Sequence, residues 1–199
     1  MRPSRADGVL RGSFPDRCPT HARPMDDPSR SWSSDDDDRP PARSERPAVV
    51  EVQDADGALG TDDLLWLREH AARAAALLGA PGEVRVRIVR DEEMAEAHLR
   101  YAGVPGTTDV LTFDLAGDAR TLDVDVLVCA DEARRQAERL AHDTRRELLL
   151  YIVHAMLHCL GHDDHDDDDY QRMHDTEDRL LEQLGVGITF ARDQEGNAS

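Results

Sequence analysis

Apolar and polar positions alternate in two ways along the chain, and from residue 47 onward they predict a mixture of strands and helices. Residues 83–89 alternate apolar and charged side chains, as a half-buried strand does. Similar short apolar runs predict further strands over 47–53, 108–114 and 122–129. Apolar residues three and four apart predict helices over 61–78, 91–101, about 130–140, from 143–144 through the histidine-rich stretch, and 167–184.

This mixture of elements predicts an α+β domain spanning residues 47–185. The strands over 108–114 and 122–129 are closely spaced, which favours a small mixed sheet. The expected architecture is a four-stranded mixed sheet packed with about five helices, with the histidine-rich helix at its centre.

The two ends of the chain are expected to lie outside that domain. Residues 1–46 are rich in Pro, Ser, Arg and Asp, contain few apolar residues, and are predicted to form a disordered extension. Residues 186–199 are predicted to form a flexible tail.

Charge is distributed unevenly. The formal net charge is −18, yet residues 1–46 hold nine Arg and nine Asp or Glu, which balance. The net negative charge therefore lies entirely in residues 47–199. Such an acidic body argues against broad nonspecific binding of nucleic acid, whose affinity comes from phosphate contacts. It is compatible with a local arginine patch.

Other composition features narrow the classes of protein. The three cysteines, Cys18, Cys129 and Cys159, have no paired spacing, which argues against a disulfide framework and a cysteine zinc site. No run of about 18 apolar residues occurs, and the N-terminus lacks the apolar core of a signal peptide. A cytoplasmic protein without a membrane partner is therefore expected.

Candidate chemistry concentrates in residues 154–165, which contain four of the nine histidines. His154 and His158 are four residues apart, so on a helix both imidazoles lie on one face. Gly161 accepts the left-handed backbone of a helix end, which lets the chain turn back. A third donor from His162, Asp164 or His165 would complete a three-ligand site with one free position, as in catalytic zinc sites.

The surroundings of the pair favour a metal over a chance spacing. Isolated His-x-x-x-His pairs are common, but this helix is apolar, and buried imidazoles need polar partners. The acidic run 163–169 is predicted to be an exposed loop that caps the next helix and supplies at most one donor to the site. His174, on the last helix, is predicted to be structural.

Ala155 bears on the type of reaction. Zinc peptidases of the His-Glu-x-x-His type carry their general base at the position of Ala155, so its identity disfavours a peptidase. A water acidified by a metal ion can still attack a phosphodiester.

Two separated motifs resemble the YbeY family of metal-dependent endoribonucleases. The family signature, similar to His-Gly-x-Leu-His-Leu-x-Gly-Tyr-Asp-His, stands at residues 154–165 as His-Ala-Met-Leu-His-Cys-Leu-Gly-His-Asp-Asp-His. The family stretch Thr-Asp-Val-Leu-Ser-Phe-Pro stands at residues 108–114 as Thr-Asp-Val-Leu-Thr-Phe-Asp. The resemblance covers about residues 47–185, in the same order.

The resemblance implies one zinc ion per chain, held by three histidines, and cleavage of single-stranded RNA. It also implies work on the 3′ end of 16S rRNA and in ribosome quality control, with rRNA and the small ribosomal subunit as partners and no DNA. The implied ligands are His154, His158 and His165, with a one-residue insertion in the loop. Asp164, at the family's position by simple count, is the alternative third ligand.

The sequence does not identify a catalytic side chain. A metal-bound water is the expected nucleophile. His154 is a candidate for a catalytic role, and Asp109 and the acids of 163–169 are candidates for the general base.

One departure from the family affects the predicted activity. The family usually has an arginine, thought to touch RNA, after the tyrosine that precedes the Thr-Asp-Val-Leu strand. Here Tyr101 is followed by Ala102, and Arg100 would point elsewhere on a helix. An alternative function is therefore a ribosome-assembly binding factor whose zinc is mainly structural.

Overall fold

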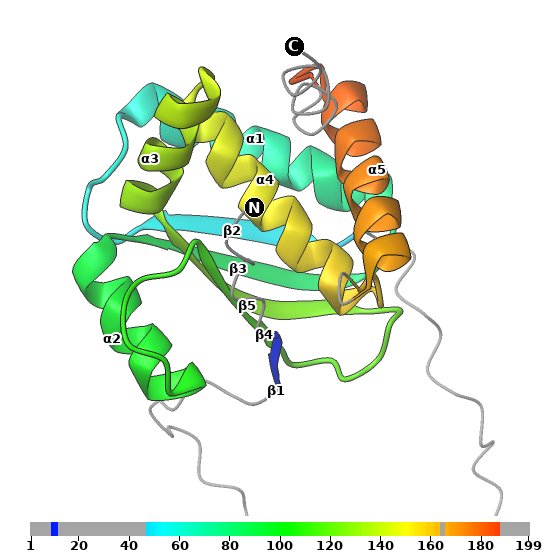
Figure 1. The fold of residues 1–199 in the computed structure, drawn as a ribbon. Coiled ribbons are helices and arrows are strands. Elements are labelled where there is room, and N and C mark those ends of the chain that lie inside the picture. Colours follow the sequence, from blue (N-terminus) through cyan, green and yellow to red (C-terminus); the bar gives the residue numbers. More distant parts are fainter. Residues whose placement is uncertain (1–8, 12–46, 164–165, 188–199) are drawn as a thin grey trace, which may run out of the picture.

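The structure, a computed structural model, describes residues 9–11, 47–163 and 166–187 (Figure 1). Within these residues a five-stranded sheet has the order β1-β4-β5-β3-β2. β2, β3 and β5 are parallel, β4 is antiparallel to β5, and β1 is parallel to β4. The strands are β1 (Val9–Arg11), β2 (Val49–Asp54), β3 (Gly82–Val89), β4 (Val110–Asp114) and β5 (Leu122–Cys129).

Helices cover the two faces of the sheet unequally. The described helices are α1 (Thr61–Leu78), α2 (Asp91–Ala102), α3 (Ala130–Leu140), α4 (Thr144–Cys159) and α5 (Asp167–Gln183). α1, α4 and α5 lie on one side of the sheet and α2 on the other (Figure 1). Alternate residues of β5 follow this division: Val124 and Val126 join the larger core, whereas Leu127 joins the smaller core beneath α2.

α4 is the central helix of the larger layer. Every residue from Glu147 to Leu157 is buried, because the helix is enclosed by the sheet, α1, α3 and α5. A helix that is apolar on all sides is suited to such a position. The prediction that the histidine pair lies on a central helix is therefore confirmed.

The sequence patterns predicted the α+β class and the mixed sheet correctly. The four predicted strands and five predicted helices are all present, and their ends differ from the prediction by at most about two residues. Among the described residues, no helix combines the length and the apolar character that crossing a membrane requires.

Two boundaries differ from the prediction. Val9–Arg11, within the extension predicted to be disordered, forms β1, because the edge of β4 offers backbone partners that no local pattern reveals. Val186, predicted to begin the tail, packs against the core. The predictions for the rest of 1–46 and for 188–199 fall outside the described residues.

Candidate metal centre

His154 and His158 bring their rings together near the C-terminal end of α4. The ring planes are almost perpendicular, at 87°, with centroids 4.5 Å apart. Their Nε2 atoms are 3.0 Å apart. Two ligands on one tetrahedral zinc lie about 3.3 Å apart, given Zn–N bonds of about 2.0–2.1 Å. The four-residue spacing thus produces the convergence that the sequence predicted.

A tight turn after α4 orients the ring of His158. Gly161 has φ of +85°, and the amides of Gly161 and His162 donate to the carbonyls of His158 and Leu157, as in a Schellman motif. The turn brings the carbonyl oxygen of His162 to 3.0 Å from Nδ1 of His158. A carbonyl only accepts, so Nδ1 of His158 carries a proton.

A buried carboxylate orients the ring of His154. Oε1 of Glu177, on α5, lies 2.7 Å from Nδ1 of His154, and its Oε2 lies 2.6 Å from Nδ1 of His174. Glu177 is fully buried. Burial alone would raise its pKa, but the interactions with His154 and His174 outweigh that effect and lower the pKa to about 2. The carboxylate is therefore ionised and accepts from both rings.

These partners determine what the two Nε2 atoms can bind. In a neutral imidazole only one nitrogen carries a proton, and here the acceptors assign that proton to Nδ1 in both rings. In the neutral rings the two Nε2 atoms then face each other at 3.0 Å, so a shared proton or a metal ion must lie between them. Neutral imidazole nitrogens whose other N–H is held by a carboxylate or a carbonyl are typical metal ligands. The residues present therefore fit a divalent metal.

The remaining predicted donors are only partly described. Asp164 and His165 lie outside the described residues, and within the described part of the chain no group of three potential ligands converges. His162, one of the alternative donors, contributes its carbonyl to the turn. Burial raises the pKa of Cys159 to about 12, and the charge of Asp114 adds to the effect. The thiol therefore stays protonated and packs as a small apolar group.

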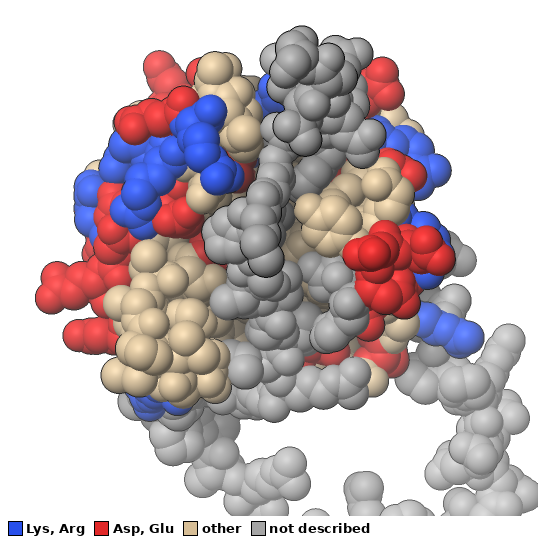
Figure 2. Space-filling model, in the orientation of Figure 1, with Lys and Arg blue, Asp and Glu red and all other residues tan. Residues whose placement is uncertain are grey.

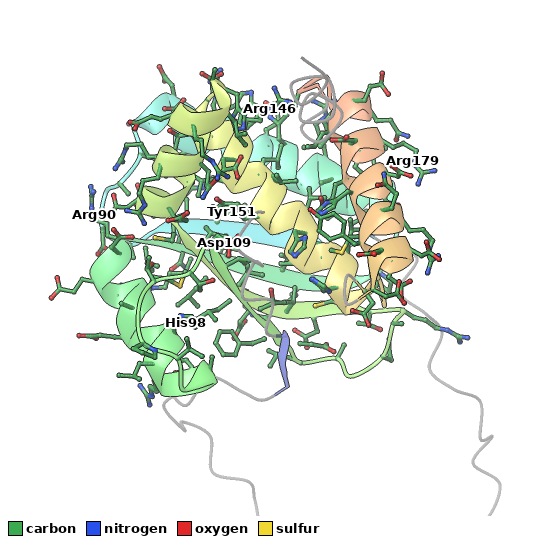
Figure 3. The ribbon with its side chains drawn as sticks, in the orientation of Figure 1. Arg90, His98, Asp109, Arg146, Tyr151 and Arg179 are labelled. Atoms are coloured by element: carbon green, nitrogen blue, oxygen red, sulfur yellow. The ribbon has the colours of Figure 1, made fainter. Side chains whose placement is uncertain are left out.

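The candidate general bases differ in their surroundings. Asp109 is buried just before β4, where its Oδ1 accepts from the Thr108 hydroxyl and the Val110 amide (Figure 3). In the acidic run, the Asp166 side chain caps α5 by accepting from the amide of Asp169, which confirms the predicted capping role.

Sequence reasoning missed Glu177 and the role of His174. Glu177 falls on the apolar stripe of α5, defined by Met173, Leu180, Leu181 and Leu184. An acidic residue at a core position must find a buried partner, and that signal was available in the sequence. His174, predicted to be structural, is buried, and it connects to His154 through the carboxylate of Glu177.

The position of the family arginine lies on the surface. Ala102 is exposed at the last turn of α2, and the Tyr101 ring packs edge-on against Phe113, with centroids 5.1 Å apart. The guanidinium carbon of Arg100 lies 5.3 Å from the centroid of the Tyr101 ring.

Comparisons with known proteins identify relatives of this chain. The chain is 39% identical over 121 residues to a Frankia alni protein named Endoribonuclease YbeY, which covers 55% of this chain and 67% of the relative. A Micrococcus luteus protein of the same name is 30% identical over 144 residues, covering 68% of this chain and 92% of the relative.

A solved structure and a sequence model of a protein family also match the chain. The solution structure of a Thermotoga maritima protein matches with a TM-score of 0.50 and 22% identity, covering 74% of this chain and 93% of that one; this likeness concerns the fold alone. The sequence model of the family described as Endoribonuclease YbeY matches residues 61–185. Because that match spans more than half of the chain, the protein belongs to the YbeY endoribonuclease family.

Proposed function

We propose that this protein is a zinc-dependent endoribonuclease that cleaves single-stranded RNA. The observation that carries the proposal is the pair of Nε2 atoms 3.0 Å apart on α4, in a chain of the YbeY family. Two nitrogens with their protons assigned elsewhere form a preorganised half of a zinc site. His165 is the proposed third ligand, and Asp164 is the alternative.

The side chains of the site have separable tasks in this proposal. His154 and His158 bind the metal, while Glu177 and the carbonyl of His162 hold the two rings. When bound, a divalent ion acidifies a water molecule and offsets charge on the phosphate oxygens. Asp109 and the acids of 163–169 remain the candidates for the general base.

We extend the proposal to the biological substrate on the basis of the family. The protein acts in maturation of the 16S rRNA 3′ end and in ribosome quality control, in the cytoplasm, with rRNA and the small ribosomal subunit as its partners. The absence of the Glu base at Ala155 agrees with a phosphodiester substrate.

Metal analysis of the purified full-length chain tests the site. We expect close to one zinc per chain, and loss of most of it in His154→Ala. His70→Ala is the matched control, because His70 lies on α1, where its Nδ1 contacts the carbonyl of Trp66. Full zinc content in His154→Ala would refute the ligand assignment.

Cleavage of a single-stranded oligoribonucleotide tests the activity. We expect metal-dependent cleavage by the wild-type chain and its loss in His158→Ala, with circular dichroism showing that the variant is folded. The sheet and the helices of the larger core should persist, because His158 is only partly buried.

A second candidate function is a ribosome-assembly binding factor with a mainly structural zinc. Ala102 in place of the family arginine and the acidic body of the chain favour it. Under this alternative, a folded but metal-free variant still supports 16S rRNA maturation in cells, whereas the nuclease proposal requires that maturation fails.

A further inference from the structure

The two histidines of the candidate metal centre are oriented by different kinds of hydrogen-bond partner. His158 is held by a backbone carbonyl four residues on, through the turn at Gly161. His154 is held by Glu177, 23 residues away on α5. The orientation of His154 therefore depends on how α5 packs against α4.

Glu177 is itself held from its other side. Its second carboxylate oxygen accepts from Nδ1 of His174, one turn earlier on the same helix. His154, His174 and Glu177 have exposed fractions of 1%, 3% and 0%, so water does not compete for these bonds. With both oxygens bonded, the carboxylate has no freedom to rotate away from His154.

We propose that Glu177, steadied by His174, is the positioning residue of the metal centre, which keeps the proton of His154 on Nδ1 and directs its Nε2 at the metal. This inference rests on the proposed metal-dependent function. It assigns to α5 a part in metal binding, although neither α5 residue contacts the metal in this proposal.

The number of hydrogen-bond acceptors required explains why position 177 needs a carboxylate. A carboxylate accepts from two N–H groups at once, whereas an amide offers one acceptor and one donor group. In Glu177→Gln, the amide satisfies one of the two protonated Nδ1 atoms and presents N–H to the other. If that other ring is His154, it must move its proton to Nε2 or turn away, and the metal loses a ligand. If it is His174, the side chain at 177 is no longer fixed from its second side, and it orients His154 less well.

The first test is zinc affinity, measured by competition with a chromogenic chelator. We expect Glu177→Gln to bind Zn²⁺ about 10–100-fold more weakly than the wild type, the usual effect of losing the carboxylate partner of a ligand histidine. Glu182→Gln, exposed on the same helix, is the matched control and should bind as the wild type does. An affinity of Glu177→Gln within twofold of the wild type would overturn the proposal.

The second test needs no substitution at Glu177 and no metal. Long-range ¹H–¹⁵N spectra of histidine rings in the metal-free wild-type chain report which nitrogen carries the proton, with His154→Ala identifying the signals. We expect Nδ1–H for His154. A ring with its proton on Nε2 would overturn the proposal even if Glu177→Gln fails to fold.

These measurements separate the positioning proposal from the nuclease proposal. Weakened zinc binding in Glu177→Gln, with Nδ1–H in His154, supports the positioning role even if the wild-type chain cleaves no RNA. RNA cleavage by the wild type together with unchanged zinc affinity in Glu177→Gln would retain the nuclease and reject the positioning role.

Discussion

At the scale of single residues, Ala102 offers a gain-of-function test of RNA binding. It is exposed at the end of α2, where a longer side chain meets no packing constraint. We expect Ala102→Arg to tighten binding of a non-cleavable 2′-O-methyl oligonucleotide. One added phosphate contact should steepen the slope of log affinity against log salt by about 0.7.

The control for that substitution carries the same change in charge elsewhere. Ala72 is exposed on α1, so Ala72→Arg should leave the salt slope unchanged. Equal effects of the two substitutions would mean that only overall charge matters and would remove Ala102 from the RNA-binding surface.

Among the described glycines, Gly82 leaves the least room for a side chain. Its φ is +136°, and a Cβ there would lie 2.6 Å from the carbonyl oxygen of Leu122 on β5. We expect Gly82→Ala to lower the free energy of unfolding by more than Gly79→Ala, where φ is +71° and space is open. The latter should cost about 1–2 kcal/mol from left-handed strain alone, and urea unfolding measures both.

Only some residues of the candidate site could be predicted from the sequence. His154 and His158 were predictable because helical spacing is local and fixes their convergence. Glu177 was not predicted, because its pairing with His154 depends on how α5 packs, over a separation of 23 residues. The third ligand is still a prediction.

At the scale of elements, β1 is the least expected part of the fold. It is a three-residue parallel strand, in register with Thr112, Phe113 and Asp114 of β4. Neighbouring N–H groups of a strand point in opposite directions, so two adjacent prolines remove whichever one faces β4. We therefore expect Leu10→Pro/Arg11→Pro to accelerate amide hydrogen exchange in β4.

A conservative double variant controls for the change in sequence. Leu10→Val/Arg11→Lys keeps every backbone donor and should leave exchange in β4 at the wild-type rate. Unaltered exchange in the proline variant would show that β1 does not protect this edge.

Arg85 links two strands on the open face of the sheet. Its guanidinium contacts Glu83 at 2.8 Å and Asp123 at 2.6 Å, and also Asp125. Removing it leaves Asp123 and Asp125 as like charges on one face of β5. We expect Arg85→Gln to lower the free energy of unfolding by about 1 kcal/mol, and added salt should recover part of this loss by screening.

Arg87 provides the comparison for Arg85. It lies on the same face of β3, but within the described part of the chain it makes a single ion pair, with Glu93 at 2.9 Å, and its side chain is 48% exposed. Arg87→Gln should therefore change stability less. If the two variants lose equal stability, the bridging of three carboxylates by Arg85 contributes nothing beyond an ordinary surface pair.

The elements themselves were mostly readable from sequence. β3 alternates visibly, and α1 carries a clear apolar stripe, so their bounds follow from local pattern. The order of strands was not readable, since it depends on which edges meet in three dimensions. β1 shows this most plainly, because it forms only against the edge of β4.

At the scale of the whole molecule, an acidic protein is proposed to act on an anionic polymer. Several arginines on the described surface form ion pairs with neighbouring carboxylates: Arg134 lies 2.8 Å from Asp131, and Arg135 lies 2.7 Å from Asp91. In Figure 2 the basic side chains at the left of the view lie among acidic ones. We therefore expect specific contacts near the proposed metal centre, rather than a broad cationic surface, to supply most of the affinity for RNA.

This charge distribution predicts that RNA binding depends only weakly on salt concentration. A slope near −0.7 arises for each phosphate neutralised on a single strand, and a net charge of −18 disfavours the neutralisation of many phosphates. We expect the slope of log affinity against log salt to be no steeper than about −2, or roughly two or three phosphates. Fluorescence anisotropy with the 2′-O-methyl oligonucleotide between low and physiological salt measures it. A much steeper slope would mean that a cationic surface outside the metal centre dominates recognition, and the acidic body would then not govern how RNA reaches the site.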